Sequence, residues 1–149
     1  MKLSSPVFQD GEEIPSRYAC EGESINPPLI IEDVVSGAQS LALVMDDPDA
    51  PAGIWTHWVL WNISPETAEI FEDSVPENAL EGENSSGNIG YDGPCPPSGI
   101  HHYSFRVYAL DAMAGMDLPA GAAVADAQKF INDHILESAE LTGIYSRKV

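Results

Sequence analysis

The chain has 149 residues, of which 24 are acidic and only 6 are lysine or arginine, giving a formal net charge of −18. This charge argues against nucleic acid and anionic membrane surfaces as partners, because no cluster of basic side chains is present to neutralise phosphates. The hydrophobic content of 44% excludes a disordered chain, and the length predicts a single domain over residues 1–149 with one core.

Prolines and glycines divide the chain into short segments that are mostly β-like. The predicted strands are, in chain order, Leu3–Phe8, Leu29–Ile31, Leu41–Met45, Trp55–Ile63, His101–Asp111 and Leu141–Val149. One helix is predicted near Ala122–Glu137, where apolar residues recur at helical spacing. The stretch Glu81–Gly90 is rich in Ser, Gly and Asn and is typical of a surface loop. The predicted fold class is mainly β, with the helix packed on a sheet.

The two longest predicted strands carry polar side chains at their starts. Both faces of Trp55–Ile63 are largely apolar, as in a central strand, so His57 is expected to be at least partly buried. In the segment His101–Asp111, a period of two places His101 and Tyr103 on one face. The same period divides Trp55–Ile63 into one face with Trp55, His57, Val59 and Trp61 and another with Thr56, Trp58, Leu60 and Asn62.

Two proline-containing segments far apart in the chain hold the candidate functional residues. Asp47–Pro51 leads to Trp55–Trp58, and Gly93–Pro97 leads to His101–Tyr103. Because proline fixes its own φ and keeps the preceding residue extended, the Asp47 carboxylate lies on a stiffened turn. Two imidazoles, tyrosine hydroxyls and loop N–H groups suit a small oxyanion such as phosphate or a carboxylate. The segments therefore predict one anion pocket assembled from two distant loops.

The charge at this pocket is expected to differ from that of the surrounding surface. Asp47 favours a protonated histidine at the site, which gives local positive character inside a negative protein. A screening length of about 8 Å in physiological salt allows the two to coexist. A small phosphate-containing ligand is expected to bind with micromolar to millimolar affinity, falling as the pH rises through about 6.5.

The same residues allow other interpretations. Asp47 and Asp49 could simply accept backbone N–H groups in an Asx turn. A metal site would join Asp46, Asp47 or Asp49 with His57 and His101, although no recognised zinc-ligand spacing is present. A further alternative is a protein-interaction module whose pocket is vestigial.

The two cysteines leave a further alternative open. A hydrolase-type enzyme would use Cys95 as nucleophile, with His57 or His101 as base and Asp47 as orienting group. The simpler interpretation of Cys95 is a small, buried and inert thiol. Cys20 and Cys95 can pair only if the fold brings them together, and a reducing cytoplasm favours free thiols.

The predicted location follows from the amino-terminal segment. Met1–Glu13 has no apolar core of a secretion signal, so a cytoplasmic protein is expected. The apolar runs are far shorter than the roughly 20 residues of a membrane span, so no integral membrane association is expected.

Several motifs in one order make the chain similar to a known family. The motifs are Ile14–Pro15, Tyr18–Gly22, Asn26–Leu29, Ser40–Leu43, Asp46–Pro51, His57–Val59, Gly90–Pro97, His101–Phe105, Tyr108–Asp111 and Ala139–Tyr145. With them, the chain resembles the phosphatidylethanolamine-binding protein family, also called Raf kinase inhibitor proteins, and most closely its short bacterial and archaeal branch.

This resemblance implies a large antiparallel sheet, a smaller second sheet and one or two short helices. It also implies a pocket for phosphate or a phosphorylated headgroup, no cofactor, a regulatory or inhibitory role toward a protein target, and no established catalysis; a homodimer is possible. The chain has His102 where the family usually has arginine, and alternation points this residue away from Tyr103. Carried over by position, the ligand-binding residues are Asp47, Ala50, Pro51, Trp55, His57, Cys95, Pro96, His101 and Tyr103.

Overall fold

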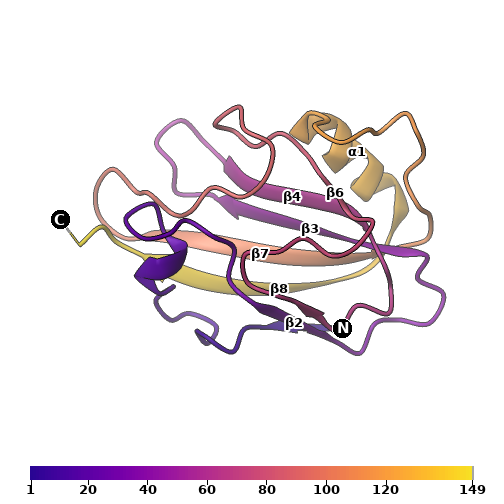
Figure 1. Cartoon of the computed structure of the whole chain (residues 1–149), viewed down its shortest axis with the longest axis horizontal. Helices are drawn as coiled ribbons and strands as arrows, with labels where there is room; N and C mark the ends of the chain where they lie inside the picture. The colour runs from indigo at the N-terminus through magenta and orange to yellow at the C-terminus, as the bar shows by residue number, and fades with distance from the viewer. Residues whose placement is uncertain (149) are drawn as a thin grey trace.

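The computed structural model describes residues 1–148 and contains two antiparallel sheets (Figure 1). The large sheet has the order β6-β4-β3-β7-β8 and the small sheet the order β1-β2-β5. The strands of the large sheet are β3 (Ser40–Asp47), β4 (Trp55–Ile63), β6 (Leu80–Glu81), β7 (His101–Leu110) and β8 (Ile135–Tyr145). The other elements are β1 (Lys2–Ser4), η1 (Ser16–Tyr18), β2 (Leu29–Glu32), β5 (Glu69–Ile70) and α1 (Val124–His134). The predicted mainly-β fold class is therefore confirmed.

Two clusters of buried side chains cover the two faces of the large sheet. One lies between the sheets, where Leu29 and Ile31 of β2 face residues such as Met45 and Phe105. The other lies between the large sheet and α1, which packs its buried Ile131 on that side. Strand β3 is buried along its whole length because β4 and β7 flank it and both of its faces are covered. Among residues 1–148, no helix is long and apolar enough to cross a membrane.

The predicted element ends differ from the structure in several places. The first strand ends at Ser4 instead of Phe8, and the helix ends at His134. Ile135–Glu137, predicted as helix, belongs to β8, because pairing with β7 begins there with Leu110 opposite Ile135. The spacing of the apolar residues here suits a helix or a strand, so pairing with the distant strand β7 decides the secondary structure. The predicted end of the last strand at Val149 lies outside the described residues.

The stretch predicted as a plain surface loop, Glu81–Gly90, is more ordered than expected. Glu81 belongs to β6, and a single bridge joins Glu83 to Ile89. Asn84 is buried at its centre and donates from Nδ2 to the Gly90 carbonyl at 3.0 Å. The asparagine therefore fixes the shape of a segment that borders the start of β4.

The register between β3 and β4 shifts at His57. Trp58 lies opposite Met45 and Thr56 lies opposite Asp46, so His57 is an extra residue, the mark of a β-bulge. As a result, Trp58 joins the core between the sheets, whereas Val59 joins the core beneath α1. The predicted placement of His57 and Val59 on one face is therefore wrong, because strict alternation does not survive an extra residue.

Candidate functional site

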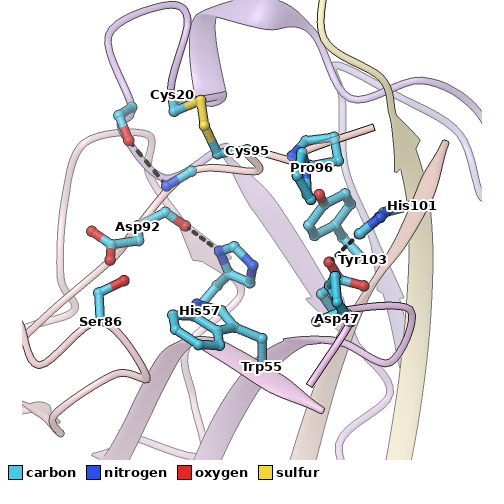
Figure 2. A pocket seen from close by; sticks show the side chains of 15 residues that line it. Cys20, Asp47, Trp55, His57, Ser86, Asp92, Cys95, Pro96, His101 and Tyr103 are labelled. Carbon is cyan, nitrogen blue, oxygen red and sulfur yellow. Dashed lines mark hydrogen bonds and ion pairs between the residues drawn. A yellow bond between two sulfur atoms is a disulfide. The ribbon is translucent and has the colours of Figure 1, made fainter. Parts of the chain in front are cut away.

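A cavity of about 380 Å³ opens at the end of the large sheet where β4 and β7 begin (Figure 2). Asp47 at the end of β3, His57 on the bulge of β4, and Tyr103 on β7 converge on it. The nine predicted site residues all line this cavity: Asp47, Ala50, Pro51, Trp55, His57, Cys95, Pro96, His101 and Tyr103. The structure thus assembles the two distant segments, while their role in binding stays a prediction.

A buried carboxylate–imidazole pair forms one wall of the cavity. His101 Nδ1 lies 2.6 Å from Asp47 Oδ2, and the two residues are only 8% and 4% exposed. The other oxygen, Asp47 Oδ1, accepts the Asp49 N–H at 2.8 Å. One oxygen of the carboxylate therefore closes an Asx turn, and the other orients His101. The Asx turn and the place of Asp47 in the cavity wall are thus compatible.

A second carboxylate–imidazole pair lies just outside the cavity. Asp49 Oδ2 accepts the backbone N–H of His102 at 2.8 Å and contacts His102 Nδ1 at 2.7 Å. The hydrogen bonds from His102 hold the pKa of the Asp49 carboxyl below its usual range. His102 is exposed and is not among the lining residues, so it ties the loop after β3 to β7 without forming a pocket wall.

His57 lies across the cavity from Asp47 and His101 (Figure 2). Its Nδ1 is 2.9 Å from the Asp92 carbonyl, and its ring meets Tyr103 edge-on with centroids 5.3 Å apart. Burial lowers the pKa of His57, and the hydrogen bond to the Asp92 carbonyl only partly opposes this. His57 therefore favours the neutral form, with Nδ1–H donating to the carbonyl and Nε2 unprotonated. This lowered pKa is opposite in direction to the expectation that Asp47 favours a protonated histidine at the site.

The Tyr103 hydroxyl is the most unusual polar group in the cavity. It is buried and has no hydrogen-bond partner among the described residues. Burial raises the pKa of Tyr103, and the Asp47 and Asp49 carboxylates add to this, while the nearby Cys95 backbone opposes it without meeting hydrogen-bond geometry. The hydroxyl thus stays protonated and is available as a donor. A buried donor without a partner is costly unless a ligand or water satisfies it.

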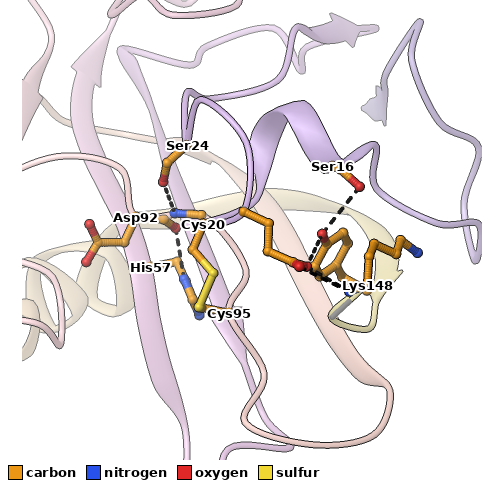
Figure 3. Close-up of a disulfide and its surroundings, with 10 residues drawn as sticks. Ser16, Cys20, Ser24, His57, Asp92, Cys95 and Lys148 are labelled. Carbon is orange, nitrogen blue, oxygen red and sulfur yellow. Dashed lines mark hydrogen bonds between the residues drawn. A yellow bond between two sulfur atoms is a disulfide. The ribbon is translucent and has the colours of Figure 1, made fainter.

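The loop that carries Cys95 is packed closely on the segment after η1 (Figure 3). The Gly93 N–H donates to Ser24 Oγ at 3.0 Å, and a β-carbon at Gly93 would lie 2.5 Å from the Tyr18 carbonyl oxygen. Only glycine permits so close an approach of two backbones. The approach also brings Asp92 to the position where its carbonyl meets His57.

The two cysteines form a disulfide, Cys20–Cys95. The sequence left this pairing open. The view of Cys95 as a buried thiol is wrong, because this residue is bridged and exposed. A sulfur that is bonded to Cys20 is no thiolate nucleophile. The hydrolase alternative that uses Cys95 with His57 or His101 is thus contradicted for this disulfide form.

Of the alternative metal ligands, Asp47, His57 and His101 line the cavity, whereas Asp46 and Asp49 do not. Asp46 points to the opposite face of the sheet, where Oδ2 lies 3.5 Å from Arg106 Nη1. Asp49 is occupied by His102 outside the cavity. Among residues 1–148, no group of three or more His, Cys, Asp or Glu side chains is arranged to hold a metal ion.

Several lining residues escaped the sequence analysis. Asp92 acts through its backbone carbonyl, which leaves no side-chain signal, and Ser86 comes from a loop with no motif of its own. Cys20 was noted only as a possible partner of Cys95. The lining residues missed are Cys20, Ser24, Ser86, Asp92, Gly93 and Pro97.

The free energy of unfolding is expected to fall as the pH drops below about 6.5, partly because of His57. A histidine whose pKa is lowered by folding binds fewer protons in the folded state, so its contribution is present above the unfolded pKa and is lost as the pH falls through the folded pKa. Urea unfolding at about pH 7 and about pH 5 should show a smaller loss for His57→Gln than for the native protein.

His134→Gln is the matched control for this experiment, because His134 is a more exposed histidine paired with Asp111. Its pH dependence should stay close to that of the native protein. Equal losses in the native protein and His57→Gln would show that His57 is not buried in the neutral form.

Comparison with known proteins gives a consistent result. The family model described as phosphatidylethanolamine-binding protein matches residues 4–146. A UPF0098 protein of Methanothermobacter thermautotrophicus is 47% identical over 152 residues, which cover 99% of each protein. A phosphatidylethanolamine-binding protein homologue of Chlamydia trachomatis superposes with a TM-score of 0.93 at 38% identity, covering 99% of this chain and 97% of that chain. YbcL of E. coli, described as a new member of the mammalian family, superposes with a TM-score of 0.92 at 30% identity. The superposition covers 99% of this chain and 98% of YbcL.

Proposed function

Because the chain belongs to the phosphatidylethanolamine-binding protein family, we propose that it binds a small anionic group, phosphate or a phosphorylated headgroup, in this cavity. The observation that carries the proposal is the buried Tyr103 hydroxyl, which has no partner among the described residues and belongs to a ring that packs against both pocket histidines. An anion oxygen there would accept this hydrogen bond. We infer a binding protein with a regulatory or inhibitory role in place of an enzyme.

The two histidines would act differently toward the anion. His101 is oriented by Asp47, whose carboxylate would also pair with the positive charge when both ring nitrogens carry protons. His57 presents an unprotonated Nε2, so it would accept a hydrogen bond from a ligand O–H or take up a proton when the anion binds. Binding is thus coupled to proton uptake, and the affinity should fall as the pH rises.

The size and charge of the cavity limit the ligand. A cavity of about 380 Å³ suits a phosphate with a small organic group. Asp47 and Asp92 both line it, and the net charge of −18 opposes the approach of any anion. These charges support weak binding, in the micromolar to millimolar range.

Exposed apolar side chains on the two loops beside the cavity support a protein target. Ile54 lies next to the pocket residue Trp55 and is 70% exposed, and Ile100 lies next to His101 and is 61% exposed. Apolar side chains beside a polar pocket are typical of surfaces that contact a partner. The proposed inhibitory role would use this rim.

His101→Ala is expected to weaken the binding of inorganic phosphate by at least about tenfold, because it removes one donor and leaves the Asp47 carboxylate facing the anion. Isothermal titration calorimetry at two pH values measures the affinity and its pH dependence. A parallel titration with phosphorylethanolamine shows whether the organic group adds to the affinity.

His134→Ala is the matched control, since it also removes an imidazole paired with an aspartate, Asp111, but lies outside the cavity. It should bind phosphate like the native protein. Absent binding, or binding that neither the pH nor His101→Ala changes, would refute a histidine-based anion site.

A further inference from the structure

The disulfide forms part of the cavity wall instead of lying in the core. Cys20 and Cys95 are both exposed and both line the cavity, although they are 75 residues apart in sequence. Figure 3 shows the bridge between the segment after η1 and the loop that follows Asp92. An exposed disulfide is open to attack by a thiolate from solvent.

The bridge is the outermost link that holds this loop. Before it, the Cys20 N–H donates to the Pro94 carbonyl at 3.0 Å, and Tyr91 Oη donates to the Tyr18 carbonyl at 2.7 Å. Beyond it, residues 96–100 make no hydrogen bond to the described part of the chain. Pro96 and Pro97, which line the cavity, are thus anchored on this side mainly through the sulfur–sulfur bond.

The same loop positions groups at the centre of the cavity. The Asp92 N–H donates to the His57 carbonyl at 3.0 Å, and the Asp92 carbonyl meets His57 Nδ1 at 2.9 Å. Pro96 lies over Tyr103 in Figure 2. Release of Cys95 would therefore change the wall opposite the Asp47 carboxylate and the surroundings of the unpartnered hydroxyl.

We propose that the Cys20–Cys95 disulfide is a redox switch that sets the anion affinity of the cavity, high when the bridge is closed and low when it is open. The inference rests on the proposed function, because it concerns regulation of the same site. The reductant is a dithiol. Its thiolate bonds to one cysteine sulfur and expels the other as a thiolate, and its second thiol then displaces the first sulfur. Two electrons pass to the protein, the dithiol ends as a disulfide, and the cysteine thiolates take up protons according to the pH.

Local opening is the expected consequence of reduction. The hydrogen bonds of Asp92 and Gly93 remain, so the fold is expected to persist while residues 94–100 become mobile. The affinity falls because the ligand must then order the loop that the bridge had already fixed.

The test compares the oxidised protein, the protein reduced with dithiothreitol, and the Cys20→Ser/Cys95→Ser variant. Thiol counting should find two new thiols after reduction. Calorimetry with inorganic phosphate should show an affinity at least about tenfold lower for the reduced protein and for the variant, and reoxidation should restore it. The variant should not respond to dithiothreitol.

A second measurement separates this switch from the proposed function. On reduction, amide hydrogen exchange of Cys20, whose N–H donates to the Pro94 carbonyl, should become faster, while exchange in β3 and β7 stays slow, whether or not phosphate binds. Absent phosphate binding in every form, together with this local exchange, would refute the anion site and leave the redox-controlled loop. Three results would overturn the switch. They are a disulfide that dithiothreitol does not reduce, phosphate binding with equal affinity by the oxidised and reduced protein, and global unfolding on reduction.

Discussion

Replacing Trp58 with alanine is expected to lower the free energy of unfolding by about 3 to 5 kcal/mol. The side chain is fully buried between the sheets, its Nε1–H donates to Glu81 Oε2 at 2.7 Å, and its ring meets Tyr91 edge-on with centroids 5.6 Å apart. The substitution creates a cavity and leaves a partly buried carboxylate without its donor. Urea unfolding at equilibrium measures the loss.

Trp58→Phe is the control for this change, because it keeps an aromatic ring in the core and removes the indole N–H. It should destabilise the protein clearly less than alanine does. A loss below about 1 kcal/mol for Trp58→Ala would mean that the bulge does not place this side chain in the core.

Gly93→Ala is expected to destabilise the protein by about 1 to 3 kcal/mol and to weaken phosphate binding at the same time. The new β-carbon would lie 2.5 Å from the Tyr18 carbonyl oxygen and 2.8 Å from the Ala19 carbonyl carbon. These are backbone atoms, so the loop must move, and Asp92 moves with it away from His57. Thermal or urea unfolding and phosphate calorimetry give the two readouts.

Gly115→Ala provides the comparison, because its β-carbon would meet only Asp117 Oδ1, at 3.4 Å. Stability and phosphate affinity should both stay close to the native values. If Gly93→Ala bound phosphate as the native protein does, the contact between the loop and the segment after η1 would not matter for the site.

Strands β4 and β7 could be predicted because their signal is local. Trp55–Ile63 has the predicted bounds, and the strand from His101 differs by one residue at its end, since aromatic and β-branched residues bounded by turn residues mark both. Strands β5 and β6 could not be predicted. Each has two residues, and only the neighbouring strand defines it.

The candidate site was predicted where side chains carry it and missed where the backbone does. Asp47, His57 and Tyr103 stand out by residue type, and the family resemblance added Ala50 and Pro51, which have no chemical signal of their own. Pairing between distant cysteines depends on the final distance between their Cα atoms, here 5.4 Å, which no spacing in the sequence gives. The carbonyl of Asp92 gives no signal in the sequence either, because every residue has a backbone carbonyl.

The bulge places His57 in the cavity wall without using it in the pairing of β4 with β3. If His57 were removed, Thr56 and Trp58 would follow each other in regular alternation and would keep their present partners, Asp46 and Met45. The pocket histidine is thus an insertion that ladder formation with β3 does not use. Substitutions of His57 can therefore alter the cavity while the pairing of β4 with β3 stays in place.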